Sequence, residues 1–416
     1  MTDLFTKTTK TVPADEAARN ARLLIQAGFI HKEMAGVYAY LPLGLRVLEK
    51  IKQIVREEMD SIGGQEVMMT TLQPRDIWEK TNRWDDSVVD NWFKTALKNG
   101  TELGVGLTHE EPIVDALSAY VNSYKDLPVL VYQIQNKFRN ELRAQAGLLR
   151  GREFVMKDMY SFARTQAEHD ALYERIAEAY GRVYQRLGIG DITYRTKADG
   201  GYFTERFSDE YQTISDIGED TVYVDEAKKL AINKEVYTDE NLAKLGITKA
   251  DLVEKHAVEV GNIFPLETKY TDALSVYYTD ETGAQRSIIM GCYGIGISRL
   301  MGVLAEHFSD DKGLAWPESV APFRVHLVRL GESPEVVKQA DELYSSLTAH
   351  GISILYDNRN IRPGEKFADA DLIGIPHRLV VSDKTVQAGS YEYKLRTSDA
   401  VQQLQSDALL KLLGAK

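Results

Sequence analysis

The feature that most constrains the fold is a pair of alternating segments joined by a short, arginine-rich loop. Hydrophobic and polar side chains alternate in residues 129–138 (VLVYQIQNKF) and again in residues 151–162 (GREFVMKDMYSF). This alternation is typical of β-strands with one buried face. The loop sequence between them, residues 143–149 (RAQAGLL), is short. We therefore predict an antiparallel hairpin in the middle of the chain.

Cationic side chains gather at the loop end of this predicted hairpin. Strand alternation places Arg139 and Glu141 on one face, and Arg150, Arg152 and Asp158 on one face of the returning strand. Because a guanidinium binds phosphate oxygens bidentately, facing arginines could hold a polyphosphate. Charge-rich strands with cross-strand ion pairs are also common on solvated sheet surfaces. From the hairpin alone, both interpretations remain open.

Helices and strands are both expected in the rest of the first three quarters of the chain. Apolar residues at helical spacing predict helices at 15–30, 43–62 and 166–187. Residues 65–74 (QEVMMTTLQP) are typical of a strand that Pro74 closes. Residues 288–308 predict an apolar strand, a glycine turn and a helix.

Residues 226–254 differ in composition from the segments around them. They follow a stretch of expected polar strands at 193–224, they are rich in Lys and Glu, and they show little apolar pattern. We interpret them as a short surface insertion.

Residues 322–416 predict a separate α/β domain at the end of the chain. Strands alternate with helices there, which is typical of a compact α/β unit. The strands are expected at 323–330, 352–357, 377–382 and 391–396, and the helices at 333–351, 365–373 and 398–413.

Composition and charge exclude several classes of protein. The net charge of −12 argues against a chain that coats nucleic acid indiscriminately. The sequence has no run of about 18 apolar residues, so no membrane-spanning helix is expected. The single cysteine, Cys292, excludes an intrachain disulfide and favours a reducing, cytoplasmic setting. The sequence contains neither the phosphate-binding pattern GxxxxGK[ST] nor a cluster of metal ligands.

Two further motifs carry chemistry. In the segment THEE, Thr108 and Glu110 offer a hydroxyl and a carboxylate suited to gripping an ammonium group, although Thr108 with Glu111 also fits a helix capping box. In the segment GCYGIGISRL, Arg299 falls on the first turn of a helix after a glycine turn, where it could point over a ligand held by the hairpin. Alone, it would more often be an ordinary helix-surface arginine.

The order of these pieces is specific. A long helix with a strand, an arginine hairpin, and a glycine turn with an arginine-bearing helix resemble the three motifs of class II aminoacyl-tRNA synthetases. The segments LTHEEPIVDAL, YQIQNKFRNELRAQAGLLRGREFVMKDMYSF and MGCYGIGISRL are similar to those of bacterial prolyl-tRNA synthetases. The resemblance implies an α+β fold, with an antiparallel-sheet catalytic domain at 1–225 and 255–321 and an α/β anticodon-binding domain at 322–416.

The resemblance also implies a reaction and its site residues. The enzyme would activate L-proline with ATP and Mg²⁺ and transfer it to the 3′ end of proline tRNA. The residues expected around ATP are Arg139, Glu141, Arg150, Phe154, Glu259, Asn262 and Arg299. Those expected around proline are Thr108, Glu110, Arg139, Met156, Asp158, Tyr160, Phe264 and Cys292. Arg139 and Arg299 would be catalytic, Glu259 would help to hold Mg²⁺, and Arg143 would face the tRNA acceptor end.

Several positions depart from the family pattern. Thr70 stands where the first motif normally has proline, Asn262 replaces a histidine, and Gln145 stands where arginine is common. The large editing domain that bacterial members usually carry is missing, since residues 226–254 alone occupy its place. We expect a homodimer, because the helix at 43–62 and the strand at 65–74 occupy the place of the family's dimer motif. Because the editing domain is missing, we also expect a separate deacylating protein in the same cell.

Two other functions fit the sequence less well. A non-catalytic, synthetase-like RNA-binding or regulatory paralogue would usually have lost the ATP arginines, whereas Arg139, Arg150 and Arg299 are present. A synthetase for threonine would need zinc-ligating cysteine and histidines, and the required set is missing.

Overall fold

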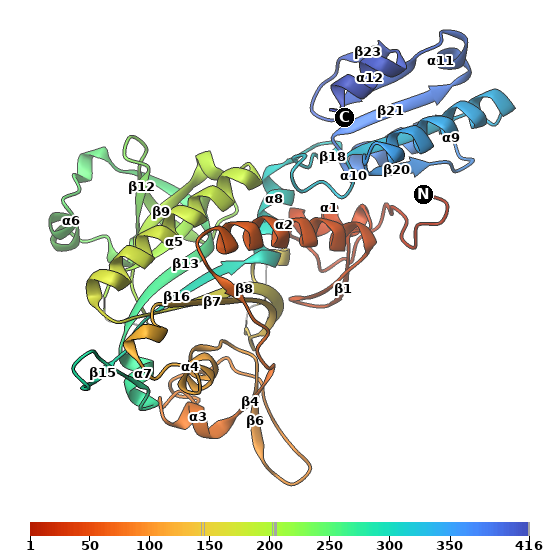
Figure 1. The fold of residues 1–416 in the computed structure, drawn as a ribbon. Coiled ribbons are helices and arrows are strands. Elements are labelled where there is room, and N and C mark those ends of the chain that lie inside the picture. The colour runs from red at the N-terminus through yellow and green to blue at the C-terminus, as the bar shows by residue number, and fades with distance from the viewer. Residues whose placement is uncertain (143, 145, 202, 204–205, 415–416) are drawn as a thin grey trace. The chain divides into compact units, whose positions relative to one another are not determined.

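The computed structural model describes residues 1–142, 144, 146–201, 203 and 206–414 (Figure 1). The chain forms two compact units. The larger unit contains Ala35–Val37 and Ile51–Leu300, and the smaller unit contains Met1–Met34, Tyr38–Lys50 and Met301–Lys416. The N-terminal segment therefore belongs with the C-terminal part of the chain.

A mixed sheet forms the centre of the larger unit, and nine strands build it within the described residues. Its neighbours are antiparallel except for the pairs β12–β9 and β3–β7. In spatial order the strands are β10 (Ser208–Ile214), β9 (Thr193–Ala198), β12 (Leu230–Asn233), β11 (Asp220–Asp225), β13 (Val253–Glu267), β16 (Ile289–Gly296), β8 (Glu153–Ala163), β7 (Val129–Phe138) and β3 (Gln65–Glu66).

The predicted hairpin is confirmed. Strands β7 and β8 pair antiparallel from Val129 opposite Phe162 to Phe138 opposite Glu153. Arg139, Glu141, Arg150 and Arg152 lie outside both strands, so the argument from strand alternation does not apply to them. The loop between the strands sets the positions of these side chains instead.

Part of the sheet closes on itself. Strand β13 pairs with β11, β16 and also β10, so β10, β9, β12, β11 and β13 form a ring of paired strands. Strand β12 comes from the segment that we interpreted as a surface insertion. Helix α6 (Asp239–Leu245) of the same segment buries Leu242 in a cluster with Ile232 and Val236. These elements are too short to show a periodic apolar pattern, so the sequence does not predict that β12 joins the sheet or that α6 packs in an apolar cluster.

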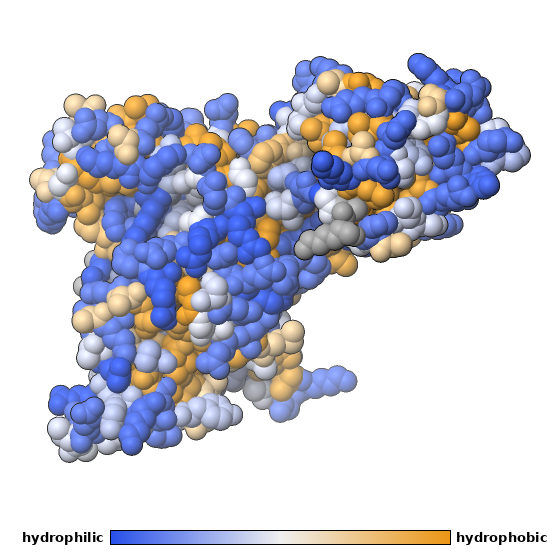
Figure 2. Space-filling view, turned by 45° about the horizontal axis from the view of Figure 1, so that its top comes forward, coloured by the Kyte–Doolittle hydropathy of each residue, from blue (hydrophilic) through white to orange (hydrophobic). Residues whose placement is uncertain are grey.

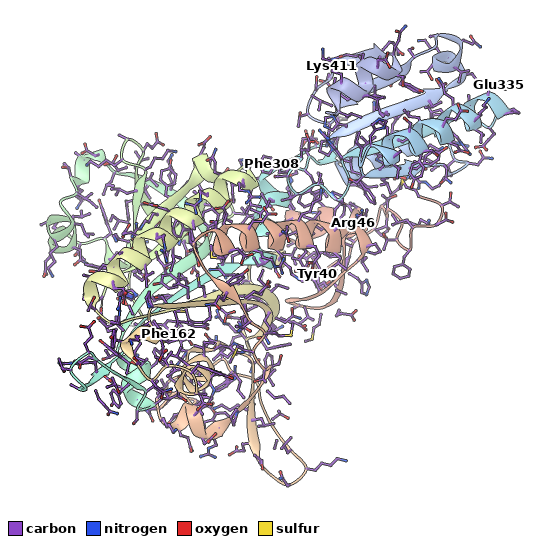
Figure 3. All side chains as sticks on the ribbon, viewed as in Figure 1. Tyr40, Arg46, Phe162, Phe308, Glu335 and Lys411 are labelled. Carbon is purple, nitrogen blue, oxygen red and sulfur yellow. The ribbon has the colours of Figure 1, made fainter. Side chains whose placement is uncertain are left out.

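Packed helices bury the central strands. Helix α5 (Gln166–Leu187) lies along the sheet (Figure 1), and its buried face includes Tyr180 and Tyr184. Thr165 caps this helix because its hydroxyl accepts a hydrogen bond from the backbone N–H of Glu168. Phe162 of β8, labelled in Figure 3, is fully buried in a cluster that also contains residues of α4 (Glu110–Ser118) and α7 (Lys269–Ala273).

The strand expected at 65–74 is wrong in its middle. Only β3 and β4 (Leu72–Pro74) are strands, and β4 pairs with β6 (Glu102–Val105) in a separate small sheet with β5 (Lys94–Ala96). Side chains of β7 hydrogen-bond to the segment between β3 and β4. Gln133 accepts from the N–H of Met69 at 3.0 Å, and Gln135 donates to its carbonyl at 2.6 Å. Amide side chains thus replace the backbone ladder.

The smaller unit contains a sheet of five strands among its described residues. Their order is β20 (Ile354–Asp357), β19 (Val325–Leu330), β21 (His377–Ser382), β22 (Tyr391–Leu395) and β23 (Val401–Leu404), flanked by α9 (Pro334–Ala349), α10 (Pro363–Ile373), α11 (Asp383–Gln387) and α12 (Ser406–Leu412). The helix expected at 398–413 is therefore wrong in its first half. Val401–Leu404 pairs with β22 instead, and the helix is restricted to α12.

The remaining elements complete the two units. The helix expected at 15–30 is the shorter α1 (Arg19–Gln26), which precedes the hairpin-like pair β1 (Ile30–Met34) and β2 (Val37–Tyr40). The others are α2 (Pro42–Ser61), α3 (Arg75–Glu79), β14 (Tyr277–Thr279), β15 (Gln285–Ser287), α8 (Ile297–His307), β17 (Ser309–Asp310) and β18 (Gly313–Leu314).

Hydrophilic side chains cover most of the face seen in Figure 2, where hydrophobic residues form separate patches. Among the helices of the described residues, none combines the length and the apolar character needed to cross a membrane.

A glycine at the end of α10 allows close packing in the smaller unit. Gly374 has φ +76°, and a Cβ there would lie 2.2 Å from the carbonyl oxygen of Leu314. Gly351 follows α9 with φ +73°, and a Cβ there would meet nothing within 4 Å. A side chain at either position would strain the backbone, but only at Gly374 would it also clash with a neighbour.

We therefore predict that Gly374→Ala destabilises the smaller unit more than Gly351→Ala does. The left-handed conformation should cost each variant about 1–2 kcal/mol, and the clash should add about 1–3 kcal/mol in Gly374→Ala alone. Native-state hydrogen exchange of the β19 and β21 amides would measure the difference. Equal losses of protection would contradict the packing argument.

Candidate functional site

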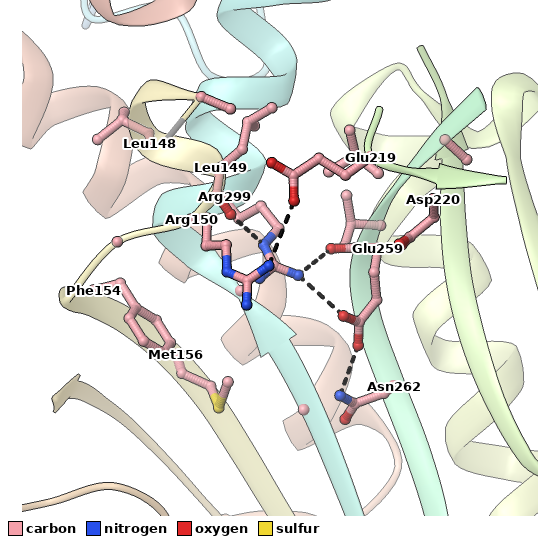
Figure 4. A pocket seen from close by; sticks show the side chains of 18 of the residues that line it. Leu148, Leu149, Arg150, Phe154, Met156, Glu219, Asp220, Glu259, Asn262 and Arg299 are labelled. Atoms are coloured by element: carbon pink, nitrogen blue, oxygen red, sulfur yellow. Dashed lines mark hydrogen bonds and ion pairs between the residues drawn. The ribbon is translucent and has the colours of Figure 1, made fainter. Parts of the chain in front are cut away.

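A cleft of about 270 Å³ opens in the larger unit beside the loop end of the β7–β8 hairpin (Figure 4). Strands β8, β13 and β16 and the start of α8 contribute its walls. The structure brings eight of the sequence-predicted residues together here, namely Arg139, Glu141, Arg150, Phe154, Met156, Glu259, Asn262 and Arg299. The predicted ATP residues therefore share one cleft.

Two arginines of the cleft are held by carboxylates. The Nε of Arg299 donates to the Leu149 carbonyl at 2.8 Å, and its Nη1 lies 3.2 Å from a carboxylate oxygen of Glu259. Arg150 pairs with Glu141 at 3.0 Å and with Glu219 at 3.5 Å (Figure 4 shows the Glu219 contact). The Arg150 side chain is 47% exposed, so these pairs are weak. An anionic ligand can therefore displace them.

The opposite wall of the cleft is formed by β8. Phe154 and Met156 alternate with the buried Val155 and face the cleft, as Figure 4 shows. The guanidinium carbon of Arg139 lies 5.3 Å from the centroid of the Phe154 ring. A flat ring can pack against this wall with the arginine beside it.

Arg152 has a different role from its neighbours. It is absent from the cleft lining formed by the described residues, because its Nε donates to the Glu141 carbonyl at 2.9 Å and its Nη1 to the Ala35 carbonyl at 2.8 Å. Arg152 therefore fixes the backbone of the loop.

Acidic groups gather at the β13 edge of the cleft. Glu259 accepts a hydrogen bond from Asn262 at 2.8 Å, and Asn262 lies opposite Glu210 in the β10–β13 register. Burial, together with the charge of Glu259, raises the pKa of Glu210 to about 8. Burial, with a smaller effect of Glu259, also raises the pKa of Asp220. Near neutral pH the Glu210 carboxyl is therefore mostly protonated, and a cation bound nearby would favour its ionised form.

Sequence reasoning missed Glu210 and Asp220. They lie in the polar strands expected at 193–224, where no motif distinguished them from solvated residues. No group of three or more His, Cys, Asp or Glu side chains forms a ready-made metal centre in the part of the chain that the structure describes.

A buried polar cluster surrounds Glu110. The hydroxyl of Thr108 donates to its carboxylate at 2.7 Å, and the thiol of Cys292 donates at 3.3 Å. Burial raises the pKa of Cys292, which keeps the thiol protonated and able to donate. The capping-box interpretation of Thr108 is wrong, because His109 occupies the N-cap of α4 without a side-chain cap bond.

A second buried group surrounds Asp158. Its carboxylate lies 2.8 Å from the Nζ of Lys137 and accepts from Gln133 and from the Tyr160 hydroxyl, each at 2.9 Å. Burial alone would raise the pKa of Asp158, but the charge of Lys137 lowers it below its usual range. The sequence placed Lys137 on the polar side of a strand, yet it is fully buried.

His109 links this group to the first motif. Its Nδ1 accepts from Lys137 at 2.9 Å, and its Nε2 donates to the Thr70 carbonyl at 2.9 Å. Burial, with the nearby Lys137 charge, lowers the pKa of His109 to about 4, so the ring is neutral. Thr70 contributes only a carbonyl to this contact, which any residue could supply.

Three strands bring the other predicted proline residues together. In the sheet register Phe264 lies opposite Cys292, and Cys292 lies opposite Tyr160. The ring of Phe203 stacks on Phe264 at 4.7 Å. Along β8, Met156 of the cleft is followed by Asp158 and Tyr160, so the buried cluster continues from the cleft along one strand. Arg143 and Gln145 lie outside the described residues.

Comparison with family models gives two matches. Residues 93–308 match the tRNA synthetase class II core domain (G, H, P, S and T), and residues 324–416 match the anticodon binding domain. Together these matches cover most of the chain.

Curated relatives extend over the whole chain. It is 37% identical over 430 residues to the proline–tRNA ligase of Anaplasma marginale, covering 100% of both chains. It is 39% identical over 436 residues to that of Phenylobacterium zucineum, covering 99% of each. The alignment with the enzyme of Bacillus cytotoxicus, 30% identical, covers 95% of this chain and 96% of the relative and runs over 547 positions. That relative therefore has long stretches without a counterpart here.

Solved structures share the fold. A crystal structure of prolyl-tRNA synthetase from Cryptosporidium parvum, complexed with L-proline and AMP, matches with a TM-score of 0.76 at 16% identity, covering 95% of this chain and 74% of that one. A second structure of that enzyme, with halofuginone and AMPPNP, matches with a TM-score of 0.78. The predicted α+β fold, with a class II core and a C-terminal anticodon-binding domain, is confirmed.

Proposed function

The chain belongs to the proline–tRNA ligase family, and we propose that its cleft activates L-proline with ATP and that the prolyl group is then transferred to the 3′ end of proline tRNA. One observation supports this most directly. Three arginines line a cleft at one end of β8. Farther along this strand, Tyr160 lies opposite Cys292, which together with Thr108 donates to the buried carboxylate of Glu110. Such a site suits a triphosphate next to a cationic amino acid.

In the proposed first step, a carboxylate oxygen of proline attacks the α-phosphorus of ATP. The new P–O bond forms as the bond to the bridging oxygen breaks, and pyrophosphate leaves with the electron pair. Negative charge grows on the phosphoryl oxygens, where Arg139 would stabilise it, while Arg150 and Arg299 would hold the leaving pyrophosphate. No general base is required, because the attacking carboxylate is already ionised.

The other predicted residues would orient the two substrates. Phe154 would stack on adenine, with Glu141 near its amino group and Met156 between the two sites. Thr108 and Glu110 would grip the imino nitrogen. The proposed walls around the proline ring are Asp158, Tyr160, Phe264 and Cys292.

Mg²⁺ fits the acidic edge of the cleft. Glu259 and Asp220 both line the cleft, and carboxylate oxygens are the ligands that Mg²⁺ prefers. Glu259 would be the main protein ligand, with Asn262 orienting its carboxylate at 2.8 Å. The bound ion would neutralise phosphate charge.

In the proposed second step, a hydroxyl of the terminal tRNA ribose attacks the carbonyl carbon of prolyl-adenylate, and AMP leaves. Arg143 would face the acceptor end.

We propose domain boundaries of 1–225 and 255–321 for catalysis, 226–254 for the short insertion and 322–416 for anticodon binding. A cytoplasmic location is proposed because translation takes place there. The comparisons do not support a non-catalytic paralogue.

We predict that the protein catalyses proline-dependent exchange of pyrophosphate into ATP. Arg139→Ala should reduce the exchange by about 10²–10³-fold, as the loss of one preorganised donor does. Arg164→Ala, which removes a partly exposed pair with Glu168, should keep near-normal exchange. Exchange with another amino acid but not proline would refute the substrate. Normal exchange by Arg139→Ala would refute the role of that arginine.

We also propose a homodimer. The edge of the main sheet ends in the two-residue strand β3, and Met68 beyond it is 88% exposed. An open sheet edge with an exposed apolar side chain favours pairing with a second copy, and twofold assembly is the commonest in soluble oligomers.

Sedimentation should therefore give twice the 46.8 kDa mass of the chain. Met68→Asp should shift the protein toward the monomer, because the introduced charge would be buried. Val401→Asp, at a 52% exposed position of the smaller unit, is the control and should leave the mass unchanged. A wild-type monomer at micromolar concentration would rule the dimer out.

A separate deacylase is the last proposed partner. A pocket sized for proline admits alanine, since missing methylenes cost about 1–3 kcal/mol each. Residues 230–233 are committed to the sheet ring, so the rest of 226–254 is too short for a second domain with its own core. Alanine mischarged onto proline tRNA should therefore persist with the purified enzyme. Hydrolysis well above the uncatalysed rate would show that the chain edits by itself.

A further inference from the structure

Arg83 is a buried cation that no sequence motif distinguished. It lies in the loop after α3 and is 2% exposed. Its Nη1 donates to Glu110 at 3.1 Å and to Glu111 at 2.9 Å. Both carboxylates are fully buried on the first turn of α4. One guanidinium thus serves two carboxylates, of which only Glu110 belongs to the proposed proline site.

The surroundings fix the guanidinium in place. Its central carbon lies 4.9 Å from the ring centroid of Trp78, 5.3 Å from that of Tyr270 and 5.4 Å from that of Phe203. Aromatic faces attract a cation and allow it little freedom. Since Phe203 also stacks on Phe264, the aromatic enclosure of Arg83 continues into the wall of the proposed proline pocket.

Glu111 accepts hydrogen bonds from two buried or half-buried partners. The Thr81 hydroxyl donates to it at 2.6 Å in addition to Arg83. Burial and the Glu110 charge raise the pKa of Glu111, and Arg83 opposes that rise. Counted as ionised groups, Glu110, Glu111 and Arg83 carry one net negative charge in a place that solvent does not reach.

We propose that Arg83 and Glu111 are positioning residues that determine substrate specificity. They hold Glu110 in place and set the net charge of this buried group at minus one. The site therefore accepts a ring with a cationic nitrogen and rejects an uncharged ring of the same shape. This inference rests on the proposed function. Arg83 and Glu111 act through Glu110 and do not touch the substrate. A buried charge is costly unless it is paired, so the nitrogen of bound proline completes the balance.

The charge count makes a prediction that a purely structural role does not. Glu111→Gln leaves Arg83 and Glu110 as a neutral pair, so a bound cation would have no counter-charge. The double variant Arg83→Gln/Glu111→Gln leaves Glu110 alone and restores one negative charge. Removing the Arg83 charge as well should therefore restore the preference for a cationic ring that Glu111→Gln loses.

The experiment uses the full chain and two competing ring compounds. Tetrahydrofuran-2-carboxylate has the shape of proline with an uncharged oxygen in place of the nitrogen. For the wild type, Glu111→Gln and the double variant, we would measure the KM for proline, the KM for ATP and the inhibition constant of the oxygen analogue in pyrophosphate exchange.

In Glu111→Gln, the preference for proline over the oxygen analogue should fall by on the order of tenfold or more, the change that one pKa unit of charge interaction represents. The KM for ATP should stay near the wild-type value. The double variant should regain most of the preference. Circular dichroism would confirm that each variant is folded.

Four results would count against the inference. An unchanged preference in a folded Glu111→Gln would overturn it, as would equal losses for proline, the analogue and ATP. If the double variant does not fold, Arg83→Lys replaces it. That variant keeps the charge count and should keep the preference, and its loss would be contrary evidence. A wild type without proline-dependent exchange would overturn the proposed function as well, so the two failures are distinguishable.

Discussion

The pairing of buried carboxylates with buried cations is the constraint on which this site depends. Glu110, Glu111 and Asp158 lie where solvent does not reach, and each has a cation within about 3 Å, supplied by Arg83 or Lys137. The charges of Arg83 and Lys137 are thus paired with carboxylates in the interior of the protein. Arg139, Arg150 and Arg299 instead face a cleft, where their contacts are partly exposed and replaceable. The chain thus separates charges that hold the site from charges that can hold a ligand.

The hairpin connects the two kinds of charge. Strand β8 carries Phe154 and Met156 at the cleft and Asp158 and Tyr160 in the buried cluster, so a single strand spans both. The nucleotide and the amino acid would therefore meet on one rigid element. The closed ring of strands that includes β12 supports β13 on the side away from β16. Strand β13 in turn carries the acidic edge of the cleft.

Sequence reasoning found what is local and missed what depends on distant contacts. The hairpin, α2 and α5 follow from periodicity, and the cleft residues from motifs and a family resemblance. Arg83 and Glu210 lie at positions without a pattern, and their importance comes from contacts with strands and helices far along the chain. The helix expected at 398–413 failed because β22 offered backbone partners to Val401–Leu404, a tertiary effect that overrode local preference.

A crystal structure of the chain with L-proline and a non-hydrolysable ATP analogue would test the central claim most directly. We expect the guanidinium groups of Arg150 and Arg299 to leave Glu219 and Glu259 for phosphate oxygens, Arg139 to contact the α-phosphate, and Glu110 to bind the ring nitrogen of proline. A nucleotide bound outside this cleft would contradict the account, and so would proline bound away from Glu110.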